Sequence, residues 1–130
     1  MPFNLAESFL LAAEQKLGVK LPESYRSSML RENGGELEAE EDDWQQYPIA
    51  DTSDRKRLSR TANHIINETE SCRTWPNFPR GALAIAGNGS GDQLVLLQQG
   101  ASFAPAVYVW SHETGQLEKI ADDFAELKAL

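Results

Sequence analysis

The chain contains one cysteine, Cys72, among its 130 residues, so no disulfide can form within it. This scarcity agrees with a reducing compartment. Long apolar runs are also missing: no stretch approaches the length that spans a bilayer, and the N-terminus lacks the basic region and apolar core of a signal peptide. We therefore expect a cytoplasmic protein that has no membrane partner.

Basic residues are scarce as well, because twelve lysines and arginines stand against twenty aspartates and glutamates, for a net charge of −8. Duplex DNA and anionic membranes would repel such a chain, so we expect no direct binding to nucleic acid. Between Glu32 and Asp54 there are nine acidic residues and no basic one. The basic residues that follow are Arg55, Lys56, Arg57 and Arg60. They lack interleaved aromatic residues, which favours charge balance with the acidic segment over contact with RNA.

Helical spacing and end signals predict two helices near the N-terminus. The first covers residues 5–17, with Asn4 and Glu7 as a capping box. The second begins at Pro22, because proline suits a first helical position, and the glycines of residues 33–35 end it.

Two more helices are expected farther along the chain. One runs from near Asp54 to near Glu70. Its apolar face comprises Leu58, Ala62, Ile65, Ile66 and Thr69. The two prolines of residues 73–80 cannot continue it, so this segment is predicted to be a crossing loop. A last helix follows a capping box of Asp123 and Glu126 and uses Phe124, Leu127 and Leu130.

Strand signals dominate the second half of the chain. Residues 82–97 form two apolar runs joined by a glycine-rich turn, and residues 107–110 lead through a turn at 112–115 into residues 116–120. This pattern is a β-meander from about residue 82 to 121. The acidic segment 36–49 has poor periodicity and is predicted to be irregular chain or an exposed edge strand.

Helices followed by strands and a final helix define an α+β protein. We expect a mainly antiparallel sheet wrapped by about four helices. The length suits one domain over residues 1–130, because a chain of this size buries about two-thirds of its unfolded surface. The predicted core includes Ile85, Leu94, Leu96, Trp110 and Phe124.

The glycine-rich turn at 87–91 could also bind phosphate through its amides. A dinucleotide fingerprint, however, needs its last glycine to open a helix, whereas Asp92 and a strand follow here, and the Lys-Ser/Thr ending of a P-loop is missing. A plain connection between strands is the favoured interpretation.

Candidates for catalysis or metal binding are few. Cys72 and His64 lie eight residues apart, so they could pair on a helix, but an unreactive thiol and a surface imidazole are favoured. His112 follows Trp110 by two positions and is expected to hydrogen-bond rather than bind metal, because no second ligand lies at a suitable spacing. The acidic run lacks the glycine and ligand spacing of a calcium loop. We expect no catalytic residue, metal or cofactor.

Five segments together resemble a known family: residues 17–25, 33–35, 85–92, 107–112 and 120–124. Their order and spacing resemble those of the SMI1/KNR4 family, the core of the SUKH superfamily, over nearly the whole chain. The resemblance implies an α+β domain without catalytic residues. It also implies a protein-binding role, because small bacterial members are typically immunity proteins that neutralise polymorphic toxins, often nucleases or deaminases. Other members are regulatory or scaffold proteins.

The family-motif residues are interpreted as structural. Pro22 starts a helix, Tyr25 fills the core, and Asp92 accepts hydrogen bonds from turn amides. The full set is Pro22, Tyr25, Gly34, Gly35, Gly91, Asp92, Trp110 and His112.

The acidic segment follows no fixed pattern of the family, so it is either a solvated loop or a surface for one partner. Apolar anchors within a charged patch are typical of interfaces, and the charge would speed encounter with a basic protein. The predicted partner-binding residues are Glu36, Glu38, Glu40, Glu41, Asp42, Asp43, Trp44 and Tyr47. We therefore expect stoichiometric binding to a basic toxin domain, by occlusion or by mimicry of phosphates. The alternatives are a regulatory scaffold without a toxin and, least favoured, an enzyme.

Overall fold

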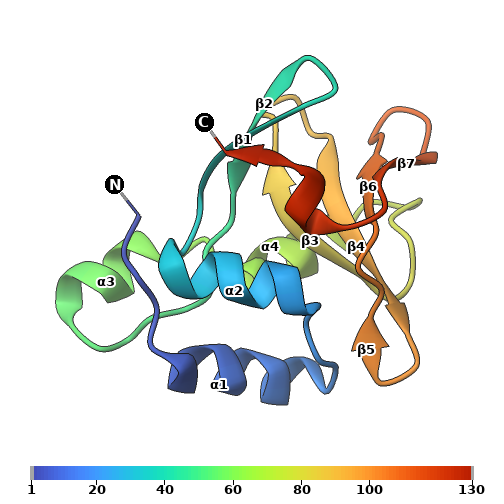
Figure 1. The fold of residues 1–130 in the computed structure, drawn as a ribbon. Coiled ribbons are helices and arrows are strands. Elements are labelled where there is room, and N and C mark those ends of the chain that lie inside the picture. The colour runs from blue at the N-terminus through green and yellow to red at the C-terminus, as the bar shows by residue number, and fades with distance from the viewer. Residues whose placement is uncertain (1, 130) are drawn as a thin grey trace.

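The computed structural model describes residues 2–129, which fold into four α-helices and eight strands (Figure 1). The helices are α1 (Glu7–Leu17), α2 (Glu23–Arg31), α3 (Arg55–Arg60) and α4 (Ile65–Cys72), with a 3₁₀ turn, η1, at Phe124–Glu126. The strands are β1 (Gly35–Ala39), β2 (Asp42–Gln46), β3 (Ala82–Gly87), β4 (Gln93–Gln99), β5 (Ser102–Phe103), β6 (Val107–Trp110), β7 (Leu117–Ala121) and β8 (Lys128–Ala129).

The strands pair antiparallel in the order β7-β6-β4-β3-β2-β1-β8, and the short β5 pairs with the far end of β4. The predicted meander is confirmed as β3, β4, β6 and β7. Residues 82–86 of β3 are buried without alternation, which explains why that strand reads as a continuous apolar run. The α+β class with an antiparallel sheet is therefore confirmed.

The acidic segment forms a hairpin, so the expectation of irregular chain or an exposed edge strand is wrong. β2 lies between β1 and β3, and β8 covers the other edge of β1. The two turn residues, Glu40 and Glu41, have φ values of 52° and 60°. Positive φ at both central positions is the conformation of a type I′ turn, which usually carries asparagine and glycine. Glutamates at these positions concealed the hairpin in the sequence.

The helix predicted from Asp54 to Glu70 is divided in two. α3 ends at Arg60, where the Thr61 hydroxyl hydrogen-bonds to the Arg57 carbonyl at 2.9 Å and competes with further helical bonding. The side chain of His64 then caps the start of α4. Because of this break Leu58 is exposed rather than packed on a common apolar face.

The predicted helix ends are partly wrong. Asp123 caps the last element as expected, but that element is a single 3₁₀ turn, and the chain then extends into β8 to pair with β1. Leu130 lies outside the described residues. At the other end α1 follows Ala6 without a side-chain cap, and the capping box predicted at Asn4 is absent. The backbone carbonyl of Asn4 instead accepts a hydrogen bond from Arg57.

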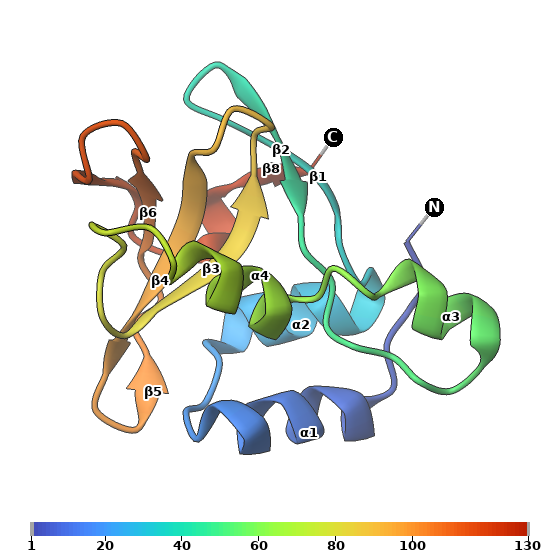
Figure 2. The same cartoon turned by 180° about the vertical axis from the view of Figure 1, so that it is seen from behind.

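α1 and α2 lie side by side below the sheet in both views, and α3 lies to one side of it (Figures 1 and 2). α4 runs across β3 and packs against it (Figure 2). The main core contains the predicted residues Ile85, Leu94, Leu96 and Phe124. Trp110 is also buried, but in a second cluster with Ala82 and Val95 against which Phe78 packs. The loop of residues 73–80 therefore covers part of the opposite face of the sheet.

Candidate functional site

Three strand turns meet at one end of the sheet. β1, β3 and β6 each run toward this end, and the register pairs Gln45 with Gly87 and Gln93 with Trp110. The turns lie together along the upper edge of the molecule in Figure 1. We name residues 40–43, 88–92 and 111–116 the acidic rim.

The acidic rim contains six carboxylates and neither lysine nor arginine. The carboxylates belong to Glu40, Glu41, Asp42, Asp43, Asp92 and Glu113. The rim thus accounts for six of the eight net negative charges of the chain. Sequence reasoning found only the part in the first hairpin, because the other two turns are remote in sequence and each carries a single carboxylate. The negative field of the protein is concentrated at this end.

Hydrogen bonds join neighbouring turns of the rim. The side-chain amide of Asn88 donates to Asp42 Oδ2 at 2.9 Å, which links the second turn to the first. Asp92 Oδ1 accepts from the His112 amide at 3.1 Å and lies 2.7 Å from His112 Nδ1, which links the second turn to the third. The rim is therefore a connected surface rather than three independent loops.

The hairpin displays its carboxylates outward. Glu36, Glu38 and Asp43 are exposed, whereas Leu37 and Trp44 face the core. Glu38 lies directly opposite Asp43 in the register. Like charges at such a pair destabilise a sheet by roughly 0.2–1 kcal/mol. Because this pair of carboxylates does not stabilise the hairpin, its presence is consistent with a role in binding rather than in folding.

Neither of the two aromatic residues expected to anchor a partner is exposed. Trp44 is 2% exposed, and its indole Nε1–H donates to the Ala39 carbonyl at 3.0 Å. Tyr47 is half-buried, and its hydroxyl donates to Gln93 Oε1 at 2.8 Å. Burial is the main cause that raises the pKa of Tyr47, to about 12. Trp44, which the sequence suggested as a partner anchor, therefore faces the core, because the period of two along β2 turns it inward.

A shallow cleft of about 510 Å³ lies beside the first turn of the rim. Glu38, Glu40 and Glu41 contribute to one part of its lining, and Ile120 and Leu127 supply apolar surface. The combination suits the aliphatic stem and charged head of a long basic side chain.

The family-motif residues Gly91, Asp92 and His112 come together at the rim. A Cβ on Gly91 would lie 3.0 Å from the His112 ring, and Gly91 has a φ of 113°, so glycine is needed for both space and conformation. Asp92 was expected to accept from turn amides; it accepts from the amide of His112, in the third turn of the rim, and also faces the His112 ring. No group of three potential metal ligands occurs within residues 2–129.

The motif residues in the first half of the chain lie in and around α2. Pro22 is the N-cap, one position before the helix, and Tyr25 is fully buried with its ring 5.1 Å from that of Phe124 in an edge-to-face arrangement. Burial raises the pKa of the Tyr25 phenol. Gly34 and Gly35 have φ values of 117° and 95° at the turn from α2 into β1.

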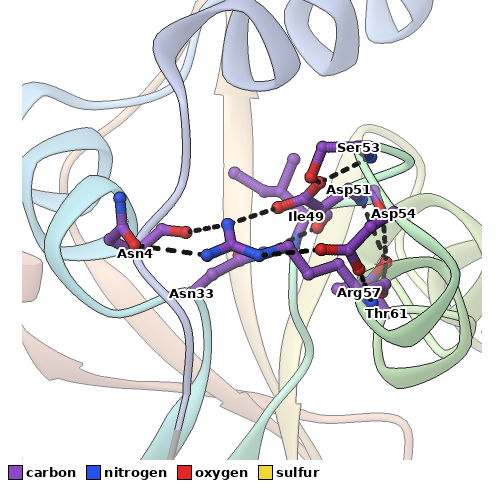
Figure 3. A network of polar contacts seen from close by, with 8 residues as sticks. All are labelled: Asn4, Asn33, Ile49, Asp51, Ser53, Asp54, Arg57 and Thr61. Atoms are coloured by element: carbon purple, nitrogen blue, oxygen red, sulfur yellow. Dashed lines mark hydrogen bonds and ion pairs between the residues drawn. The ribbon is translucent and has the colours of Figure 1, made fainter.

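Asn33, which precedes these glycines, is the centre of a buried polar contact at the base of the hairpin (Figure 3). The side-chain Nδ2 of Asn33 donates to the Ile49 carbonyl, and the side-chain Oδ1 of Asn33 accepts from the Ile49 backbone amide, both at 2.8 Å. This two-bond clamp fixes the chain after β2 against the end of α2. The motif asparagine is therefore architectural.

An ionic pair completes this network (Figure 3). Asp51 is 1% exposed, and its carboxylate accepts from Arg57 Nη1 at 3.1 Å and from Ser53. Burial alone would raise the pKa of Asp51, but the hydrogen bonds from Ser53 and the charge of Arg57 outweigh it, so that the pKa lies below its ordinary value. Arg57 also lies over the ring of Phe3, 4.6 Å from its centroid. Charge balance, the interpretation favoured for the basic segment, is thus observed for Arg57.

Cys72 and His64 do not form a catalytic pair. They stand at opposite ends of α4, about 12 Å apart along the helix axis at 1.5 Å per residue. Burial raises the pKa of the Cys72 thiol to about 11, which suppresses the thiolate. The His64 side chain accepts from the Asn67 amide as a helix cap.

The chain is thus an α+β domain with a connected acidic surface. The histidine and aspartate of that surface, His112 and Asp92, hydrogen-bond to each other. The family model described as SMI1 / KNR4 family (SUKH-1) matches residues 4–129, so the chain belongs to this family. No curated protein matches the chain as a relative. Family membership is consistent with a protein-binding, immunity-type role. None of the helices within residues 2–129 combines the length and the apolar character needed to cross a membrane.

Proposed function

We propose that this protein is a non-catalytic immunity protein of the cytoplasm that neutralises a basic toxin domain, of nuclease or deaminase type, by stoichiometric binding. The observation that carries the proposal is the acidic rim: six carboxylates without a lysine or arginine, joined across three turns. Its family supports a protein-binding role.

The physical argument is electrostatic. A nuclease or a nucleic-acid deaminase presents lysines and arginines to the phosphates of its substrate. An exposed row of carboxylates can occupy the same groove, and the charge accelerates encounter between the two proteins. Inhibition then needs only occlusion of the partner's groove and no catalytic group. This agrees with the contact between Asp92 and His112, which uses both side chains within the fold.

A regulatory scaffold with a cellular partner is the second candidate. The same acidic rim would serve it, and other members of the family have such roles. Production of the protein together with a toxin is required for immunity and is not required for a scaffold.

The test is affinity capture of the tagged protein from its native cells at low and high salt, with identification of what is retained. We expect a near-stoichiometric basic protein that carries a nuclease or deaminase domain. The variant Glu40→Lys with Glu41→Lys should lose it, whereas Glu32→Lys with Glu70→Lys, which changes the net charge equally at exposed sites outside the rim, should retain it. Equal retention by both variants would refute the role of the rim, and capture of a housekeeping regulator would favour the scaffold.

A further inference from the structure

One large aromatic residue is exposed close to the acidic rim. Trp75 is 43% exposed, whereas Trp44 and Trp110 are 2% and 1% exposed. Its ring lies 6.2 Å from that of Trp110 and 5.5 Å from that of His112, in edge-to-face arrangements. His112 belongs to the third turn of the rim, so Trp75 stands at the margin of that surface.

The position of Trp75 is fixed by its surroundings. Its backbone amide donates to the Cys72 carbonyl at 3.0 Å, and its carbonyl accepts from the Phe78 amide at 3.3 Å. The Trp110 indole donates to the Asn77 carbonyl at 3.1 Å, which ties the loop of residues 73–80 to β6. A preordered ring loses little conformational entropy when a partner covers it.

A second exposed apolar side chain extends the same face. Leu117 is 38% exposed and is the register partner of Trp110 in the neighbouring strand. Directly opposed residues on antiparallel strands project from one face of a sheet, so Leu117 flanks Trp110 on the face that the loop of Trp75 covers.

We infer that Trp75 is the aromatic anchor of the partner surface and that its occupant is an arginine side chain of a basic protein partner. This inference rests on the proposed function, since it names what the partner places beside the rim. Tryptophan is the best aromatic acceptor of a cation, and arginine is the cation found most often in such contacts. Two carboxylates of the rim lie close to His112: Asp92 contacts its ring, and Glu113 follows it in the sequence. They supply the negative charge that attracts a guanidinium.

The charge of the loop itself does not supply this attraction. Arg73 and Arg80 stand at its two ends and are exposed, so the loop is cationic by sequence. A guanidinium is therefore drawn to Trp75 by the carboxylates of the adjacent turns. Binding at Trp75 should for this reason depend on the rim and on the ring separately.

The test uses a short peptide of alternating glycine and arginine, titrated into the ¹⁵N-labelled protein at low salt and neutral pH. The indoles of Trp44 and Trp110 are buried and their N–H groups donate to backbone carbonyls, so the fastest-exchanging indole signal should belong to Trp75. Loss of that signal in Trp75→Phe assigns it. We expect this signal to shift on titration. The same peptide with citrulline in place of arginine should leave it unmoved.

Two variants separate the ring from its apolar area. Trp75→Leu keeps an apolar side chain and should weaken binding of the arginine peptide about tenfold. This factor lies between those of an exposed and of a desolvated cation–π contact, as suits a half-exposed ring. Leu11→Ala, at an exposed apolar residue of α1, should bind as wild type. Thermal unfolding of each variant verifies that it is folded. If Trp75→Leu does not fold, Trp75→Phe replaces it and should show a smaller loss, because phenylalanine is a weaker acceptor of a cation than tryptophan.

The outcomes distinguish this inference from the proposed function. Peptide binding that is lost in Glu40→Lys with Glu41→Lys but unchanged in Trp75→Leu, with no shift of the Trp75 signal, overturns the anchor and leaves the acidic rim intact. Failure of the wild type to bind the peptide at low salt also overturns the anchor, whereas the capture experiment still decides the immunity role.

Discussion

Replacing Arg57 by alanine is expected to destabilise the protein by about 3 kcal/mol. The change leaves the carboxylate of Asp51, which is 1% exposed, without its counterion. Removal of one partner from a buried ion pair costs about 3–5 kcal/mol, because the remaining charge stays desolvated. Arg57 itself is 24% exposed, and Ser53 still donates two hydrogen bonds, so the lower end of that range applies.

The measurement is urea unfolding at neutral pH, with Arg55→Ala as the matched control. Arg55 is an exposed arginine on the same helix, and its loss should change the free energy of unfolding by no more than about 0.5 kcal/mol. The double variant with Asp51→Asn should recover part of the loss, since the uncompensated charge is then removed. Equal stability of Arg57→Ala and Arg55→Ala would refute the reasoning that the pair is buried and coupled.

The remaining predictions concern pH, packing and reactivity. Because the folded-state pKa of Asp51 is below its ordinary value of 3.8, its ionised form contributes stability fully above that pH and loses it as pH falls through the folded pKa. The advantage of wild type over Asp51→Asn in acid titrations should therefore shrink only below about pH 3.8. Trp44→Ala should cost about 3–5 kcal/mol in urea unfolding, as for a buried aromatic, and a near-neutral effect would contradict its burial. Cys72, with a pKa of about 11, should react with a thiol reagent at neutral pH only when urea unfolds the chain, as mass spectrometry can follow. Gly115→Ala should lower the thermal midpoint more than Gly89→Ala, because both have positive φ but only the first would place a Cβ 2.6 Å from the Asn77 Cβ.

The sequence predicted those parts of the fold whose signals are local. The meander follows from apolar runs of strand length separated by glycines, and α1 and α2 follow from helical spacing with Gly18 and Gly34 near their ends. The hairpin was missed because its alternation, with Leu37 and Trp44 inward, lies within a dense run of charge. The break between α3 and α4 was missed because histidine is an unusual helix cap and nothing in the apolar spacing marks it.

The candidate site was predictable only in part, since its assembly depends on strand pairing over long distances in sequence. The exposed glutamates of the hairpin were identified from composition. Asp92 and Glu113 join them only because β3 pairs with β2 and β6 pairs with β4. Trp75 carries no periodic signal, and its exposure follows from the packing of its loop against Trp110.

The pairing of β8 with β1 has a consequence for biogenesis. Leu37 pairs with Ala129, so the edge of β1 stays uncovered until the ribosome has added about ninety further residues. An open strand edge beside buried Leu37 and Trp44 would otherwise recruit other nascent chains. Glu36 and Glu38 act as gatekeepers on that strand, because charge on an edge opposes self-association. The carboxylates of the hairpin would then protect the unfinished chain before any partner is met.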